Sequence, residues 1–274
     1  MCGRYASARK RIELLEEFSV QRDKVARPLE PDYNVAPTKP VYAVLTRGER
    51  AEPEAEPARE LRVVRWGLVP SWAKDASIGS RLINARAETV SEKPAFRRAF
   101  AARRCLLPAD GYYEWQAGRD GGPKQPYYIH GADGNSLAFA GLYELWRDKR
   151  VPDDDPDAWL WSATIITTSA PDELGRIHDR MPMVIGRGSW ADWLDPASGD
   201  AADLRSLLVP AASGRLISYP VATTVNSVRN NGPELIEPAE PPGPGPGPAA
   251  ELSAAELGTA DFSTGRATAQ GALF

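Results

Sequence analysis

Residue 2 carries the most reactive combination of groups in this sequence. The chain begins Met1-Cys2-Gly3-Arg4, and removal of the initiator Met1 would leave Cys2 as the amino terminus. An α-amine has a reference pKa of about 7.7–8.0, against about 10.4 for lysine, so a sizeable fraction is uncharged and nucleophilic at neutral pH. That amine can attack an aldehyde, and the adjacent thiol can close on the same carbon to give a thiazolidine ring. This terminus therefore indicates covalent capture of an aldehyde, although a cysteine also follows a start codon by chance.

The second cysteine, Cys105, stands in the apolar run Cys105-Leu106-Leu107-Pro108 and is expected to be a buried thiol within a strand. Two cysteines in 274 residues favour a reducing compartment over a disulfide-bonded scaffold. No apolar run approaches the roughly 18 residues that a membrane span needs, and the basic opening segment lacks the apolar stretch of a signal peptide. We therefore expect a cytoplasmic protein with no membrane partner.

Three short polar clusters interrupt otherwise apolar or glycine-marked sequence. They read LINARAE at residues 82–88, DGYYEW at 110–115 and RIHDRMP at 176–182. Each has an ordinary structural interpretation, because Asn84 suits a turn, Glu114 the outward face of a strand, and His178 a structural position after a short helix. Together they supply a carboxyl and an imidazole, which can move protons around a nucleophile, and an amide, which can donate and accept hydrogen bonds without adding charge.

The periodicity of apolar residues predicts two helices among more numerous strands. Residues 9–18 place Ile12, Leu15 and Phe18 on one helical face, and Ser91 is expected to cap a second helix that runs to about residue 101. Residues 131–135 (GADGN) are expected to form a hairpin turn between two of the strands. Strands are predicted where β-branched and aromatic residues gather, at residues 41–46, 61–66, 105–108, 126–130, 137–143, 159–168, 183–186 and 216–221.

These elements lack the alternating strand–helix–strand rhythm of a parallel sheet. We infer a single α+β domain of mainly antiparallel, barrel-like β-sheet with peripheral helices, spanning residues 1–237. From residue 238 the chain reads PAEPPGPGPGP, and the segment after it has too few apolar residues for a packed unit. Residues 238–274 are therefore predicted to be a disordered, Pro/Gly-rich acidic tail.

The net charge of −4 is unevenly distributed along the chain. Residues 1–110 carry 21 Lys and Arg against 15 Asp and Glu, so positive potential can gather on one face. This surplus permits a polyanion as partner without requiring one. Two loops rich in acids and prolines, residues 49–60 and 148–157, are expected to be solvated, because the triplet Asp153-Asp154-Asp155 has no neighbouring histidine. We predict no metal site and no cofactor.

Several segments, taken in combination and in order, carry a family resemblance. They are Met1-Cys2-Gly3-Arg4-Tyr5, Tyr33-Asn34-Val35-Ala36-Pro37, Trp66-Gly67-Leu68-Val69-Pro70 with Trp72, Ile83-Asn84-Ala85-Arg86, Gly111-Tyr112-Tyr113-Glu114-Trp115, His178-Asp179-Arg180-Met181-Pro182 and residues 226–236. With them the chain resembles the SOS response-associated peptidase (SRAP) family, whose members crosslink covalently to abasic sites in single-stranded DNA. The resemblance spans nearly the whole ordered region. The acidic insertion at residues 49–60 and the tail fall outside it.

The resemblance implies the SRAP fold and four catalytic residues. Cys2 would attack the ring-opened aldehyde of the abasic site and close a thiazolidine, after removal of Met1 by the protein itself or by another enzyme. Glu114 would move protons among the sugar oxygen, the amine and the carbinolamine, provided that burial raises its pKa. His178, with an unperturbed pKa near ~6.5, would be the second acid/base. Asn84 would hold the sugar hydroxyl or the terminal amine without adding charge.

The resemblance also implies a grip on the DNA strand that ignores sequence. The expected DNA-binding residues are Arg4, Pro37, Trp72, Arg86, Trp115, Thr167 and Arg180. The arginines would contact phosphates, which carry no sequence information. The tryptophans would stack on bases beside the lesion, with the proline as an apolar wedge, and such stacking tolerates any base. Each tryptophan has the alternative of a place in the core.

Two other functions stay open from the sequence. A cysteine peptidase would use Cys2 as nucleophile, His178 as base and Asn84 as orienting group, with removal of Met1 as its realistic scope. A non-covalent single-stranded DNA-binding module would give Cys2 no covalent role and would bind intact and abasic strands equally. In the favoured interpretation the partner is single-stranded DNA with abasic sites. The protein is then a monomer, near the nucleoid if bacterial, with any replication-associated protein partner unspecified.

Overall fold

The structure is a computed structural model that describes residues 2–48, 56–118, 121–152, 154–155, 158–212 and 214–239. Most of the predicted acidic insertion, and Asp153 of the acidic triplet, lie outside the described residues. Residues 240–274, which make up nearly all of the predicted tail, lie outside them as well. The predicted division of the chain into a domain and a disordered tail therefore stays a prediction.

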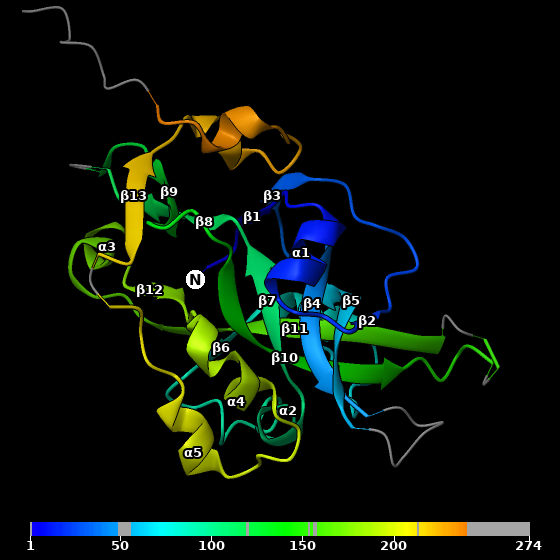
Figure 1. Cartoon of the computed structure of the whole chain (residues 1–274). Coiled ribbons are helices and arrows are strands. Elements are labelled where there is room, and N and C mark those ends of the chain that lie inside the picture. The colour runs from blue at the N-terminus through cyan, green and yellow to red at the C-terminus, as the bar shows by residue number, and fades with distance from the viewer. Residues whose placement is uncertain are drawn as a thin grey trace, which may run out of the picture. The chain divides into compact units, whose positions relative to one another are not determined.

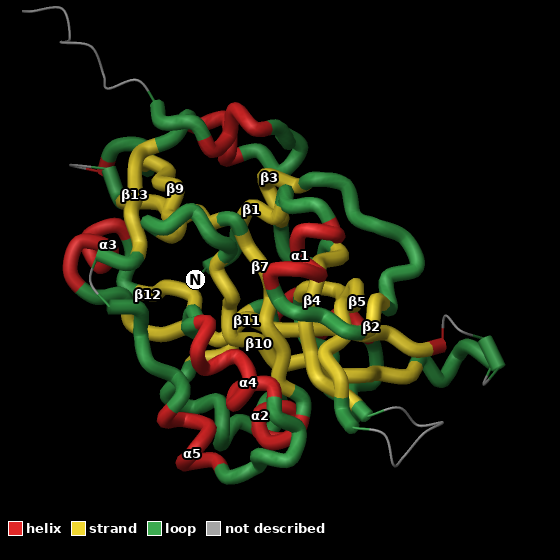
Figure 2. The backbone as a smooth tube through the Cα atoms, viewed as in Figure 1, coloured by secondary structure: helices red, strands yellow, loops and turns green. Residues whose placement is uncertain are grey.

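Five strands close into a small barrel (Figures 1 and 2). They are β4 (Pro40–Arg47), β5 (Ala58–Trp66), β7 (Arg104–Ala109), β10 (Leu137–Arg147) and β11 (Trp159–Ser169), hydrogen-bonded in the order β11-β10-β7-β4-β5. Neighbours in this order are antiparallel. A parallel pairing of β5 with β11, in which Trp66 lies opposite Ala163, closes the barrel. The predicted fold, mainly antiparallel and barrel-like with short helices, is confirmed.

Shorter strands extend the barrel, and a second sheet is formed beside it. β2 (Arg22–Asp23) pairs with β5, while β6 (Asn84–Arg86) and β12 (Arg180–Pro182) both pair with β11. The second sheet is antiparallel and has the order β13-β9-β8-β1-β3. Its strands are β1 (Tyr5–Ser7), β3 (Asp32–Val35), β8 (Gly111–Gln116), β9 (Gln125–Gly131) and β13 (Leu216–Pro220).

Aromatic side chains pack the second sheet onto the barrel. Tyr5 of β1 packs edge-on against Trp66 of β5 and Phe139 of β10, with ring centres 5.2 and 5.8 Å apart. Tyr112 of β8 packs against the same Phe139, and all four side chains are buried. Such edge-to-face pairs contribute about 0.5–1.5 kcal/mol each beyond the buried area. Because Tyr5 is anchored in this core, the residues just before it in the chain are held beside the barrel.

The helices are short. They are α1 (Arg11–Glu17), α2 (Arg97–Ala102), α3 (Asp172–Ile177), α4 (Trp190–Leu194) and α5 (Ala201–Ser206), with 3-10 turns η1 (Ala76–Arg81), η4 (Arg187–Ser189), η5 (Thr223–Asn226) and η6 (Pro233–Ile236). The first predicted helix is present as α1, but its predicted face is wrong at Ile12, which is 58% exposed. Phe18 is buried as predicted and stacks on Trp190 with ring centres 4.4 Å apart, and Leu14, four residues before it, is buried in place of Ile12.

The second predicted helix is shorter than expected and has a different start. Residues 91–96 form turns and bends, and α2 begins at Arg97, so Ser91 does not cap it. Pro94 explains the difference, because it disfavours helical geometry in Lys93, the residue before it.

Two predictions about strands also fail. Residues 183–186 form no strand, and their only described pairing is an isolated bridge from Val184 to Phe139. A turn is present where expected, with the Gly134 N–H donating to the Gly131 carbonyl at 3.1 Å, but it does not make a hairpin. β9 and β10 on its two sides belong to different sheets, so the turn passes the chain from one sheet to the other. Turn chemistry predicts a reversal of direction but not which strands then pair.

Arg104, at the start of β7, ties the short helices to the barrel. Its buried guanidinium donates hydrogen bonds to the backbone carbonyls of Phe100, Ala101, Trp193, Asp195 and Ser198. We expect Arg104→Met to lower the free energy of unfolding by about 3–5 kcal/mol, because buried carbonyls would lose charged donors. Urea unfolding measures this, with Arg98→Met on the exposed side of α2 as control at no more than about 0.5 kcal/mol. A loss below about 1 kcal/mol at Arg104 would contradict the assigned role.

Candidate active site

Strand β11 brings two of the predicted polar clusters together. It lies between β6 and β12, so Thr167 pairs with Arg86 on one side and with Pro182 on the other, and Ser169 pairs with Arg180. Asn84 is the first residue of β6. The amino-terminal end of the chain lies close to β12 and β6, on the side where β8 and β13 approach (Figure 1). Asn84 and Arg180, which are far apart in the sequence, are thus brought together because β6 and β12 both pair with β11.

Cys2 is held from two sides by these strands. Its carbonyl accepts a hydrogen bond from the Asn84 side-chain Nδ2 at 2.9 Å, and its Sγ lies 3.7 Å from the Arg180 carbonyl, to which the thiol donates. The residue is only 2% exposed. Burial, together with the nearby carboxyl of Glu114, raises the pKa of the Cys2 thiol well above its ordinary value. The resting sulfur is therefore a protonated thiol, which needs a base before it can act as a nucleophile.

Glu114 is the base within reach. It lies on β8, is 3% exposed, and its carboxyl oxygen Oε2 lies 3.9 Å from His178 Nδ1. Burial raises the pKa of Glu114, and a hydrogen bond from Cys2 and the neighbouring imidazole offset this only in part. Among the described residues, its other oxygen Oε1 has no hydrogen-bond partner, and neither has the buried Oδ1 of Asn84. Two buried acceptors beside the cysteine are therefore available to donors from a substrate.

His178 follows α3 and has one ring nitrogen engaged by the backbone. The Arg180 N–H donates to its Nδ1 at 3.0 Å, and the same Nδ1 lies 3.2 Å from the Arg180 carbonyl oxygen and 3.3 Å from Asp179 Oδ1. The imidazole is therefore oriented by the same segment that holds the thiol of Cys2.

Arg180 joins this centre through its side chain as well as its backbone. Its Nη1 and Nη2 donate to the two carboxyl oxygens of Glu88 at 2.6 and 3.0 Å, and Nη2 donates to the Thr167 carbonyl at 2.7 Å. Thr167 and Arg180, both predicted to bind DNA, are therefore neighbours joined by a hydrogen bond. It adds Glu88, to which the sequence analysis assigned no role although it follows the Asn84-Ala85-Arg86 motif.

Arg4 and Trp115 form a separate rim near the second sheet. Arg4 is half-buried, and its Nη1 donates to Asn34 Oδ1 at 2.7 Å and to the Val225 carbonyl at 2.9 Å. Its guanidinium lies 5.6 Å from the ring centre of Trp115, whose Nε1 donates to Asn226 Oδ1 at 2.6 Å. The sequence analysis assigned no role to Asn34 or Asn226. Both lie in the matching segments, and short polar side chains of this kind are a signal for such anchoring.

An open groove of about 390 Å³ leads away from Asn84. Trp72, Arg86, Lys93 and Phe96 line it with Asn84, and Trp72 is 58% exposed. The groove therefore combines an exposed aromatic face with two cationic side chains. Pro37, by contrast, is half-buried between β3 and β4 and does not line this groove.

Tyr112 was also missed by the sequence analysis. It stands two residues before Glu114 on β8, so both side chains are on the same face of the strand. Its hydroxyl is buried without a hydrogen-bond partner among the described residues. Burial, and to a lesser degree Cys2 and Glu114, raises the pKa of Tyr112 well above its ordinary value. Its position two residues before Glu114, the candidate acid, was the signal in the sequence that could have identified Tyr112.

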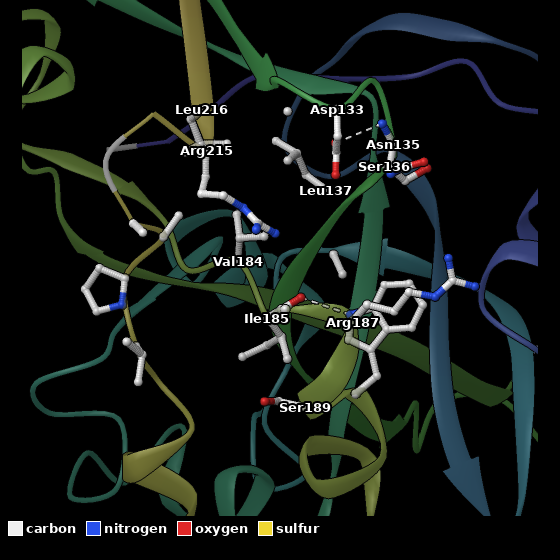
Figure 3. Close-up of a pocket in the computed structure, with 18 of the residues that line it drawn as sticks. Asp133, Asn135, Ser136, Leu137, Val184, Ile185, Arg187, Ser189, Arg215 and Leu216 are labelled. Atoms are coloured by element: carbon white, nitrogen blue, oxygen red, sulfur yellow. Dashed lines mark hydrogen bonds between the residues drawn. The ribbon is translucent and has the colours of Figure 1, made fainter.

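A somewhat larger hollow, of about 440 Å³, lies elsewhere in the molecule (Figure 3). Its walls include Leu137, Val184, Ile185 and Leu216, and Arg215 points into it. None of the residues predicted from the sequence lines it. It holds no cysteine and no histidine, so it is not the candidate active site.

The described residues contain no group of three His, Cys, Asp or Glu side chains arranged to hold a metal ion. Within the same part of the chain, no helix has the length and apolar character needed to cross a membrane. Both cysteines are free thiols, and Cys105 is buried as predicted.

A small barrel with a cysteine, a buried carboxyl and an oriented imidazole at one place defines a candidate cysteine-centred active site. The family model described as SOS response associated peptidase (SRAP) matches residues 1–228. The abasic site processing protein YoqW of Bacillus subtilis is 40% identical over 237 residues, which cover 86% of this chain and 99% of the relative. This chain therefore belongs to the SRAP family of abasic site processing proteins.

More distant relatives agree with this membership. The abasic site processing protein HMCES of Gallus gallus is 31% identical over 273 residues, covering 88% of this chain and 78% of the relative. A crystal structure of a protein from Bacteroides thetaiotaomicron has a TM-score of 0.73 and 26% identity, covering 87% of this chain and 100% of that one. The fold and the family assignment thus come from independent comparisons.

Proposed function

We propose that this protein captures abasic sites in single-stranded DNA through a covalent bond to Cys2, after Met1 has been removed. One observation carries the proposal. Cys2 is held between Asn84 and Arg180, and next to it two buried oxygens, Glu114 Oε1 and Asn84 Oδ1, lack hydrogen-bond partners among the described residues. A terminal amine and a sugar hydroxyl are donors that would satisfy such acceptors.

The proposed reaction begins at the amine of Cys2. Its lone pair attacks the aldehyde carbon C1′ of the open sugar, and proton transfer gives a carbinolamine. A proton from the carboxyl of Glu114 lets the hydroxyl leave as water, and the N–H proton of the resulting iminium returns to Glu114, which gives the imine. The Cys2 sulfur then adds to the imine carbon, and the thiol proton ends on the nitrogen. Aldehyde and aminothiol thus become a thiazolidine and one water, with no change in oxidation state.

The proton donor and acceptor roles follow from the environment of each group. Glu114 is suited to donate because burial raises its pKa, so it holds a proton at higher pH than an exposed carboxyl. His178, oriented through Nδ1, is the second group that can exchange protons. Asn84 fixes the main chain of Cys2, so the amine and the thiol are presented together.

General proteolysis fits this site less well. A cysteine peptidase needs a thiolate, which enzymes obtain by lowering the thiol pKa beside a histidine or a helix N-terminus. Here burial and a carboxyl raise the pKa of the Cys2 thiol instead. We therefore restrict any peptidase activity to removal of Met1. A purely non-covalent binding module would leave the buried carboxyl beside Cys2 without a purpose.

DNA binding is assigned to the groove that contains Asn84 and Arg86. Arg86 is exposed, and no ion pair or hydrogen bond engages its guanidinium within the described residues, so it is available to a phosphate. Trp72 offers an exposed ring on which a base can stack, worth about 1–3 kcal/mol. Arg4, Trp115 and the wedge Pro37 remain proposed contacts. DNA as substrate also agrees with the predicted cytoplasmic location.

A denaturing gel and intact-mass measurement test the proposal. Mature protein is incubated with a single strand carrying one abasic site and, as control, with the same strand intact. We expect one species that survives denaturation, only with the abasic strand, with the mass of the protein without Met1 plus the oligonucleotide minus one water. A chain that retains Met1 and yet captures the strand fully, or a crosslink mapped to another residue, would refute it.

Arg86→Ala is expected to weaken non-covalent binding to intact single strands by about five- to thirtyfold at low salt, since one phosphate contact is lost. The slope of log affinity against log salt should also fall, by about 0.7. Fluorescence anisotropy at several salt concentrations measures both quantities. Arg205→Ala, at an exposed arginine of α5, is the matched control and should change neither. An unchanged salt slope for Arg86→Ala would remove Arg86 from the binding surface.

A further inference from the structure

Arg180, whose backbone carbonyl accepts the hydrogen bond from the Cys2 thiol, has its side chain already paired with a carboxylate. Arg180 donates from Nη1 and Nη2 to the two oxygens of Glu88, which is the bidentate geometry that arginine also uses for phosphate. The Nε edge of the Arg180 guanidinium is closed to a phosphate, because Nε is buried and has no hydrogen-bond partner among the described residues. The outward edge of the guanidinium can therefore hold either Glu88 or a DNA phosphate, but not both.

The Glu88 side chain can be displaced from Arg180. Its side chain is 50% exposed, while that of Arg180 is only 15% exposed and stays fixed by the Thr167 carbonyl. The hydrogen bond from Arg180 lowers the pKa of Glu88, so the carboxyl is charged at neutral pH. The pair is therefore fixed at Arg180 and open to solvent at Glu88, so a phosphate can replace the carboxylate while the guanidinium stays in place.

We propose that Glu88 acts as a stand-in for phosphate, covering Arg180 in the DNA-free protein and lowering the affinity for undamaged single strands. This proposal rests on the proposed function. An intact strand offers only phosphates and bases, so it must displace Glu88 without further gain. An abasic strand offers an aldehyde in addition, and covalent capture makes its displacement of Glu88 permanent. Glu88 thus limits the time that the protein spends on intact strands.

The decisive measurement is the affinity of Glu88→Gln and Glu88→Ala for intact single-stranded DNA across a range of salt concentrations. We expect both variants to bind about three- to tenfold more tightly than the parent at low salt. The salt slope should become steeper by about 0.7, the value of one additional phosphate contact on a single strand.

Asp148→Asn is the matched control. Asp148 forms a comparable pair with Arg150 in the loop between β10 and β11, at 2.6 Å, and its replacement changes the net charge by the same amount. It should leave affinity and salt slope unchanged. If it tightens binding as much as Glu88→Gln does, the effect is one of net charge and the proposal fails.

A merely structural role for Glu88 predicts a different pattern. Loss of the pair would then disturb the Arg180 backbone that holds Cys2 and His178, so capture at saturating DNA would slow while affinity stayed equal or fell. That result, with parent protein forming its adduct normally, would overturn the role of Glu88 alone. Failure of the parent to form any adduct would instead refute the proposed function, and with it this inference.

Discussion

Cys2→Ala is expected to abolish the adduct that survives denaturation, with a loss of at least about a hundredfold in yield. Alanine keeps a terminal amine and can form the imine, but it has no sulfur to close the ring, and an imine hydrolyses readily. Capture is measured by denaturing gel after quenching, with the abasic strand in excess. A reductant that traps imines should restore a band for Cys2→Ala, which separates the amine step from the thiol step.

Cys2→Ser is the companion variant, because its hydroxyl has the same position but is the weaker nucleophile. It should give a lower yield or a more labile product than the parent. Cys105→Ala is the control for general loss of thiols, since Cys105 is fully buried in the barrel, and it should capture normally if it folds. An adduct of full strength with Cys2→Ala would contradict the ring-closure step.

Glu114→Gln is expected to slow capture by about a hundred- to ten-thousandfold, since positioned acid–base groups contribute factors of this size. Glutamine keeps the shape of the side chain but can neither donate nor accept the proton of the carboxyl. Single-turnover rates measured at saturating DNA isolate this effect from binding. A variant that captures at the parent's rate would exclude Glu114 as the proton shuttle.

The same variant is expected to stabilise the protein at neutral pH. Because burial raises the pKa of Glu114, the folded state holds its proton more tightly than the unfolded chain does. Stability from this group is complete below the unfolded pKa and is lost as the pH rises through the folded pKa. At pH 8 we therefore expect Glu114→Gln to unfold with a free energy about 1–3 kcal/mol higher than the parent. The difference should vanish near about pH 4.

Glu144 supplies the matched control for this prediction. It is also buried, but its carboxyl is paired with Arg103 at 2.7 Å, so its charge is compensated. Glu144→Gln should lower the melting temperature and leave the capture rate unchanged. If Glu114→Gln raises the stability and Glu144→Gln lowers it, the reactive carboxyl of Glu114 is retained at a cost in stability. Destabilisation by Glu114→Gln at pH 8 would contradict the raised pKa.

Most strands could be predicted from the sequence, because half-buried and fully buried strands have characteristic runs of β-branched and aromatic residues. All of the predicted strands except residues 183–186 are present. Failures occurred where a local pattern had more than one solution. Ser91 resembles a helix cap, yet Pro94 prevents the helix from starting there, and Ile12 fits the helical face that Trp190 does not contact.

Some features of the candidate site could likewise be predicted from the sequence, and others could not. The aminothiol at Cys2 is a property of covalent chemistry, so the sequence alone determined it, and the motifs around Asn84, Glu114 and His178 named the residues expected to join it. Only the tertiary structure decided their environment. The parallel pairings of β11 with β5 and with β6 are contacts between distant segments, and no local pattern encodes them.

That environment determines the chemistry, because a pKa depends on burial and on neighbouring charges rather than on residue type. The sequence could not tell a carboxyl on an exposed strand face from the buried one that Glu114 proves to be. Nor could it show that Glu88 covers the arginine expected to bind phosphate. The sequence determines which groups can react, whereas the proton affinities of those groups and the Arg180–Glu88 ion pair arise only when the chain is folded.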